Sequence, residues 1–124
     1  MKENLVDMAM LYDFYGDVLT EKQREYFEYY HHDDLSLSEI SENMGITRQG
    51  VRDIVTRAEN GLRKMEERLG LVKRYQDIQD GIAVILANAE GIAALNEARF
   101  MSEELRDAAQ RITDAAHALQ QKDL

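Results

Sequence analysis

Apolar residues recur three and four positions apart along most of the chain, which is the spacing of one face of an α-helix. Two such stripes lie close together near the middle of the sequence. The first contains Ile40 and Met44, and the second contains Val51, Ile54, Val55 and Ala58. The short interval between the stripes predicts two helices that are joined by a tight turn.

Polar residues at the ends of these stripes indicate where the two helices begin and end. Ser36 and Glu39 have the spacing of a capping box, in which each side chain binds the backbone amide of the other residue. Gly45 can supply the positive φ that a tight turn requires, and Thr47 is placed to cap a helix that begins at Arg48. Together these features predict a helix-turn-helix, a motif whose second helix lies in the major groove of DNA.

The second helix keeps a polar face once its apolar stripe is turned inward. On this face and at the cap before it we predict the residues that contact base edges and phosphates: Thr47, Arg48, Gln49, Arg52, Asp53, Thr56 and Arg57. The alternative is an αα-hairpin with an ordinary solvated face. It is disfavoured because the turn glycine, both caps and the basic second helix agree with one another.

Two helices are predicted before the motif. The first, over residues 4–15, has an apolar face that contains Leu5, Met8, Ala9, Tyr12 and Tyr15. The second follows Thr20, which forms a capping box with Gln23, and it contains the aromatic residues Tyr26, Phe27, Tyr29 and Tyr30. Because Glu25 and Glu28 alternate with these rings and would repel phosphate, we expect packing in the core rather than stacking on single-stranded nucleic acid.

Two further helices are predicted after the motif. The helix from Arg48 should run to about Arg68 and end at Gly70. Beyond it, one stripe contains Ile78, Ile82, Ile85, Ala89 and Ile92, and a last helix capped by Ser102 carries Leu105, Ala108, Ile112, Ala115 and Leu119. The seven-residue spacing of Leu105, Ile112 and Leu119 is typical of a seam for another helix. For residues 71–124 we favour a helical arm that forms a homodimer or binds a partner, over a purely intramolecular cap.

Composition supports an all-α protein of the cytoplasm. The 124 residues include no Pro, as expected of a chain of helices, and no Cys, which excludes disulfides and thiolate chemistry and suits a reducing compartment. No uninterrupted run approaches the roughly 18 apolar residues of a membrane span, so we expect no membrane insertion.

The charge is distributed unevenly along the chain. The formal net charge is −9, with three basic and eleven acidic residues in 1–46, eight and four in 47–75, and four and nine in 76–124. The only basic segment is therefore the second helix of the motif and its extension. This distribution is compatible with local binding to phosphate and argues against broad, non-specific affinity for nucleic acid.

No pattern in the sequence indicates an enzyme. Residues 31–34, His-His-Asp-Asp, are of metal-ligand types, but adjacent side chains at a helix end diverge, so a helix terminus followed by a turn is the preferred interpretation. The acidic residues form no constrained acid–base pair, and neither a Ser-His-Asp order nor a phosphate-binding glycine loop is present. We expect no catalytic residues, no cofactor and no metal.

Four segments of the chain resemble region 4 of bacterial sigma factors: residues 19–24, 35–40, 45–53 and 62–64. Residues 10–23, together with Thr47-Arg-Gln49, are similar to the YlxM family of helix-turn-helix proteins, and the resemblance covers about residues 1–70. Two positions depart from the family pattern, because Gly50 stands where Ala is expected and Arg52 where an aromatic residue is common. The resemblance therefore implies no particular DNA sequence preference.

The resemblance implies a sigma-region-4-like helix-turn-helix domain over residues 1–70, followed by the helical arm over 71–124. The family is a genomic neighbour of the signal recognition particle GTPase, which implies a regulator or accessory factor of that protein-targeting pathway. Three functions stay open: DNA binding, an accessory role with signal recognition particle components, and a protein-interaction module that uses the same surface without nucleic acid. RNA is disfavoured, because the motif suits the major groove of DNA better than the narrow groove of A-form RNA.

Overall fold

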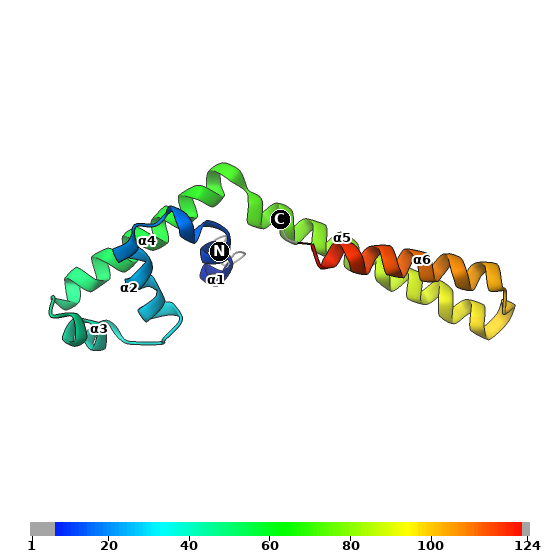
Figure 1. Ribbon diagram of the computed structural model, residues 1–124, viewed down its shortest axis with the longest axis horizontal. Coiled ribbons are helices and arrows are strands. Elements are labelled where there is room, and N and C mark those ends of the chain that lie inside the picture. The colour runs from blue at the N-terminus through cyan, green and yellow to red at the C-terminus, as the bar shows by residue number, and fades with distance from the viewer. Residues whose placement is uncertain (1–6, 123–124) are drawn as a thin grey trace. The chain divides into compact units, whose positions relative to one another are not determined.

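Helices follow one another along residues 7–122, the part of the chain that the computed structural model describes (Figure 1). They are α1 Met8–Tyr15, the 3-10 turn η2 Gly16–Val18, α2 Glu21–His31, α3 Leu37–Met44, α4 Arg48–Leu69, α5 Leu71–Leu95, the π-helical segment η3 Asn96–Phe100, and α6 Glu103–Gln120. These residues contain no β-strand, so the predicted all-α class is confirmed. The chain divides into two compact units, Met1–Lys73 and Arg74–Leu124.

The first unit is built on α4, since α1, α2 and α3 all pack against it. The inward face of α4 is buried along most of its length, through Val51, Val55, Ala58 and Leu62. One part of this face packs with Tyr26 and Ile40, and the other packs with Leu11, Tyr15 and Phe27. Full burial of a large apolar side chain contributes roughly 1.5–3 kcal/mol, so this shared core holds three helices that are too short to be stable alone.

The helix ends agree closely with the predicted caps. The backbone amide of Thr20 donates to Oε1 of Gln23 at 3.0 Å, and the amide of Gln23 donates to Oγ1 of Thr20 at 3.1 Å. This reciprocal pair fixes the start of α2. At the other end of the unit, α4 runs through Gly61 without a break and ends at Gly70, whose φ is +62°.

The apolar face of α1 differs in part from the predicted one. Leu11 and Tyr15 are buried, whereas Ala9 is exposed and Leu5 lies outside the described residues. Leu11 and Tyr15 are four residues apart and therefore share one face of the helix. The prediction placed Ala9 on the inward face and missed Leu11, because a small alanine gives little apolar area by which to orient a helix.

The first turn of α5 belongs to the core of the first unit. The carboxylate of Glu66 accepts hydrogen bonds from the backbone amides of Val72 and Lys73, both at 3.0 Å, and from the Tyr15 hydroxyl at 2.6 Å. The Tyr15 oxygen accepts in turn from the amide of Leu71 at 3.1 Å. These bonds satisfy amides at the start of α5, and Val72 is completely buried.

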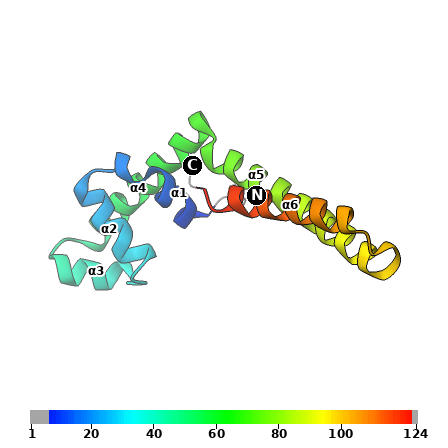
Figure 2. The same cartoon turned by 45° about the vertical axis from the view of Figure 1, so that its right-hand side comes forward.

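The second unit is a hairpin in which α5 and α6 run antiparallel, side by side in both Figure 1 and Figure 2. Its buried residues lie seven apart, and they are Ile82 and Ala89 on α5, Asn96 at the start of η3, and Ala109 and Ala116 on α6. Three of these five are alanines, which allow the two backbones to approach closely. We call this set of five residues the alanine seam.

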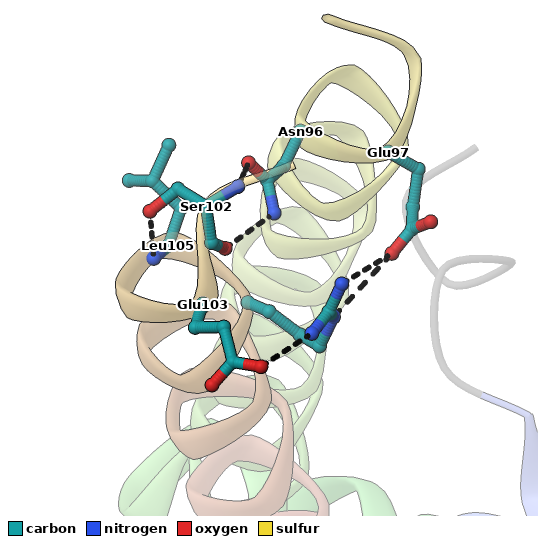
Figure 3. A network of polar contacts seen from close by, with 6 residues as sticks. Asn96, Glu97, Ser102, Glu103 and Leu105 are labelled. Atoms are coloured by element: carbon teal, nitrogen blue, oxygen red, sulfur yellow. Dashed lines mark hydrogen bonds and ion pairs between the residues drawn. The ribbon is translucent and has the colours of Figure 1, made fainter. Parts of the chain in front are cut away.

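The turn of the hairpin is closed by the side chain of Asn96 (Figure 3). Its Nδ2 donates to the Ser102 carbonyl at 2.9 Å, and its Oδ1 accepts from the Ser102 amide at 2.9 Å. Ser102 then caps α6 as predicted, because its Oγ accepts from the Leu105 amide at 3.2 Å. Because Asn96 is both buried and doubly bonded, it fixes the register between the two helices.

One helix among the described residues, Leu71–Phe100, is long and apolar enough to cross a membrane by length and composition, with a mean hydropathy of 1.3 over its most apolar stretch. The sequence predicted no such segment because it has no uninterrupted apolar run of this length, but many Ile and Ala residues raise the mean hydropathy of this helix across its polar positions. Length and composition do not distinguish a membrane span from one helix of a hairpin. Asp80 and Glu90 would each be costly inside a bilayer.

Candidate nucleic-acid interface

The turn between α3 and α4 has the geometry that its residues predict. The Ser36 amide donates to Oε1 of Glu39 at 2.8 Å, and the Glu39 amide donates to Oγ of Ser36 at 3.0 Å. Gly45 ends α3 with a φ of +72°. Oγ1 of Thr47 accepts from the Gly50 amide at 2.9 Å, so α4 begins at Arg48 as predicted.

One hydrogen bond across this turn was not predicted. The Ser41 hydroxyl donates to the Ile46 carbonyl at 2.6 Å and so ties the end of α3 to the residue before the cap of α4. The only sequence signal for it is a small hydroxyl residue on the side of α3 that turns toward the second helix. Together with Gly45, this bond sets the angle at which α4 leaves the turn.

All seven predicted contact residues are exposed and lie within the first three turns of α4 or at its cap. They are Thr47, Arg48, Gln49, Arg52, Asp53, Thr56 and Arg57. The inward residues of the same turns, Val51 and Val55, are buried, so the polar face is turned away from the core. The cap uses the oxygen of the Thr47 hydroxyl as an acceptor and leaves its proton free to donate to a ligand.

Arg52 lines two hollows that also include Leu37 of α3. One of about 300 Å³ is lined by Leu37, Arg48, Gln49 and Arg52. The other, of about 150 Å³, is lined by Tyr30, Leu37, Arg52, Val55, Thr56 and Glu59. Arg48 and Arg52 are one helical turn apart, and both can therefore reach the same ligand from one side of α4.

The three arginines of this face are not engaged in ion pairs. Among residues 7–122, the arginine and histidine ion pairs join Arg24 to Asp17, His31 to Glu59, and Arg106 to Glu97 and Glu103. Arg48, Arg52 and Arg57 take part in none of them, so their guanidinium groups can bind an external anion without breaking an internal contact. Nε2 of Gln49 donates to Oδ1 of Asp53 at 2.9 Å, which orders these two side chains on the same face.

Tyr26 and Phe27 of α2 are buried in the core as predicted, whereas Tyr29 is half-buried and Tyr30 is exposed, so the core packing predicted for all four aromatic residues is confirmed only in part. The predicted helix terminus at residues 31–34 is also confirmed, since α2 ends at His31. His31 has a role that was not predicted. Its Nε2 lies 2.7 Å from Oε2 of Glu59, and its ring stacks on Phe27 at 4.3 Å between centroids, so it fastens the end of α2 to α4 below the polar face.

A wider hollow of about 670 Å³ lies elsewhere on the first unit, along α2 and the end of α3. Its lining residues are Glu21, Lys22, Arg24, Glu25, Tyr26, Glu28 and Met44. Three carboxylates against two basic groups give this hollow an unfavourable charge for phosphate. The polar face of α4 is therefore the better candidate for a nucleic-acid interface.

Comparison with known proteins agrees with this geometry. Residues 2–98 match the family described as "Putative helix-turn-helix protein, YlxM / p13 like", so the match extends beyond residues 1–70, to which the sequence resemblance was limited. A UPF0122 protein of Thermoanaerobacter sp. (strain X514) is 51% identical over 90 residues, which are 73% of this chain and 77% of the relative. A UPF0122 protein of Listeria welshimeri is 36% identical over 112 residues, which are 90% of this chain and 96% of the relative.

Proposed function

Because the chain belongs to the YlxM / p13-like family of helix-turn-helix proteins, we propose that it is a small regulatory protein of the cytoplasm that binds duplex DNA. The observation that carries this proposal is the cluster of Arg48, Arg52 and Arg57 on the first turns of α4, exposed and free of ion pairs. In a helix-turn-helix these turns of the second helix face the major groove.

The residues of the polar face divide into two roles. Arg48 and Arg52, one turn apart near the start of α4, are placed to read base edges, and a guanidinium binds O6 and N7 of guanine with two hydrogen bonds. Gln49 and Asp53 are held together by their mutual hydrogen bond and offer amide and carboxylate groups to neighbouring bases. Arg57 lies farther along the helix and serves as a phosphate contact.

The charge distribution favours site-specific binding over general affinity. The net charge is +4 over residues 47–75 but −8 over 1–46 and −5 over 76–124. The acidic residues of the rest of the chain repel the phosphate backbone, which suppresses non-specific binding. Contacts to bases must then contribute a large share of the affinity.

Selection from a random pool of short DNA duplexes tests the proposal and finds the bound sequence in the same experiment. Full-length protein should enrich a short common motif over successive rounds, and the double variant Arg48→Ala, Arg52→Ala should fail to enrich it. Circular dichroism should show that the variant keeps its helices, since both positions are exposed. A pool that stays random after selection with wild-type protein would overturn DNA binding.

A second measurement identifies the partner if DNA fails. The family resemblance links the chain to the signal recognition particle pathway, and the same face of α4 could bind a protein of that pathway. Pull-down from a cytosolic extract with and without nuclease separates the two cases. Capture of proteins that is lost on nuclease treatment supports the DNA proposal, whereas capture that persists and depends on Arg52 supports a protein-interaction module.

A further inference from the structure

The hairpin leaves most of its large apolar side chains partly exposed, with Ile82 as an exception. Six residues at seven-residue spacing are each between 40% and 54% exposed: Ile78, Ile85 and Ile92 on α5, and Leu105, Ile112 and Leu119 on α6. The seven-residue repeat predicts that Leu105, Ile112 and Leu119 form a seam with another helix. They do not form the seam with α5, because α6 turns Ala109 and Ala116 toward it instead.

The register fixed by Asn96 aligns these six residues in three layers. The Asn96–Ser102 contact sets which residues of the two helices face one another. Seven residues earlier on α5 and seven later on α6, Ala89 faces Ala109. A further step of seven brings Ile82 opposite Ala116. The isoleucines and leucines beside the seam follow the same steps of seven. They form three apolar pairs: Ile92 with Leu105, Ile85 with Ile112, and Ile78 with Leu119. We call this set of six residues the isoleucine–leucine face.

The opposite side of the hairpin has no such face. The positions that mirror the face across the alanine seam are mostly polar or small and include one large apolar residue, Leu86: Gln79, Leu86 and Ala93 on α5, and Arg106, Thr113 and Gln120 on α6. A solvated hairpin with no other partner would be expected to carry polar residues on both sides. The asymmetry therefore points to a partner on one side only.

Gly81 lies on the side of α5 that carries the isoleucine–leucine face. It lies inside α5 among Ile78, Val84 and Ile85, and an added Cβ would meet nothing within 4 Å. Glycine in a helix interior lowers helix stability, and close packing within the hairpin does not require it here. A close approach by a surface from outside the hairpin would account for it.

We propose that the isoleucine–leucine face docks on the same face of a second copy of this chain, so that two hairpins form a four-helix bundle. The contact is self-complementary, because a two-fold axis through the Ile85–Ile112 layer places the apolar residues of one copy against the apolar residues of the other. The net charge of −5 over residues 76–124 opposes the other apolar occupant, an anionic lipid surface.

The size of the face suits a specific dimer. The 18 residues of α6 span about 27 Å at 1.5 Å per residue, and two adjacent helices are roughly 20 Å wide. Docking would therefore cover roughly 500 Å² on each copy, or about 1,000 Å² in total, which reaches the lower range of specific interfaces. This dimer does not depend on whether α4 binds DNA.

The test compares two aspartate substitutions on α6 in the full chain. Sedimentation over a wide concentration series should show wild-type protein at twice the mass of the chain. Ile112→Asp should raise the dimer dissociation constant roughly tenfold or more, because it places an unpaired charge in the contact. Gln110→Asp adds the same charge on the opposite side and should leave the dimer intact.

A second pair of variants covers the case in which Ile112→Asp loses its helical signal. Ile85→Ser on α5 should dissociate the dimer, and Ala83→Ser across the alanine seam should not. A wild-type chain that is monomeric at every concentration overturns the proposal, as does a dimer that Ile112→Asp and Gln110→Asp affect equally. Binding of a monomeric chain to phosphatidylglycerol vesicles would also overturn it and assign the face to lipid.

Discussion

The two units of this chain use their large and small apolar residues in opposite ways. In the helix-turn-helix unit, the side chains with no exposure include Phe27, Ile40 and Leu62, which are among the largest it has. In the hairpin unit, Ala89, Ala109 and Ala116 occupy the contact, while Ile85 and Ile112 lie outside it. The first unit buries these large residues in its own core, whereas the hairpin leaves the six residues of the isoleucine–leucine face between 40% and 54% exposed.

The difference separates two kinds of apolar stripe that look alike in a sequence. A stripe of large residues closes a core when short helices surround it, as α1, α2 and α3 surround α4. Where alanines form the contact between two helices, the helices approach each other closely at the alanine positions. The large apolar residues beside them can then lie outside that contact. The place of the alanines therefore indicates which stripe forms the internal contact and which stripe is available to a partner.

The largest expected effect is in the core of the helix-turn-helix unit. Phe27→Ala should lower the free energy of unfolding of this unit by about 3–5 kcal/mol, because Phe27 is fully buried against α1 and α4. Hydrogen exchange read by mass spectrometry should show faster exchange in α2 and α4 and unchanged exchange in α6. Equal acceleration in both units would contradict their independence.

The matching change in the hairpin is Asn96→Ala. It should cost about 1–3 kcal/mol, because the backbone amide and carbonyl of Ser102 lose their partners. Exchange should rise in α5 and α6 and stay unchanged in α2. Glu97→Ala, beside it at the exposed turn, is the control and should have a much smaller effect, since its ion pair with Arg106 is solvent-exposed.

A smaller effect is expected at the turn of the motif. Gly45→Val should destabilise the first unit by about 1–2 kcal/mol, because its φ of +72° is a left-handed conformation that a β-branched residue adopts poorly. Thermal unfolding measures the loss. An added Cβ meets nothing within 4 Å at this position, so a melting curve like that of wild type would remove backbone conformation as the reason for glycine here.

The smallest effect is a dependence of stability on alkaline pH. Burial, and then the hydrogen bond to Glu28, raise the pKa of Tyr12 to about 12. A phenol whose pKa is higher in the folded state stabilises the fold fully below the unfolded pKa of 10, and this contribution is lost as the pH rises toward 12. The free energy of unfolding of wild type should therefore fall more steeply than that of Tyr12→Phe between these values. Parallel curves would contradict the role of Tyr12.

Much of the first unit could be predicted because its signals are local. The capping boxes at Thr20 and Ser36, the glycine at position 45 and the cap at Thr47 each depend on residues within three positions. The inward face of α1 and the burial of Val72 depend on contacts between distant parts of the chain. Neither feature has a local signal. The inward face of α1 was therefore predicted only in part, and the burial of Val72 was missed.

The candidate interface shows the same division. The polar face of α4 followed from helical periodicity, which places Arg48 and Arg52 opposite Val51 and Val55. The contacts that hold this face in position, such as His31 with Glu59 across 28 residues, could not be predicted from spacing. In the hairpin, both the alanine seam and the isoleucine–leucine face repeat every seven residues, so periodicity alone could not decide between them.

The most direct test of the central claim, DNA binding through α4, is a titration of the selected duplex at several salt concentrations with two arginine variants. Arg52→Ala should weaken binding by about 1–3 kcal/mol, as expected for loss of a base contact. Arg68→Ala removes the same charge from an exposed position 16 residues farther along α4 and is the matched control. We expect Arg68→Ala to bind the duplex with near wild-type affinity. Equal losses of affinity in the two variants would contradict the claim, and so would a wild-type protein that does not bind the duplex.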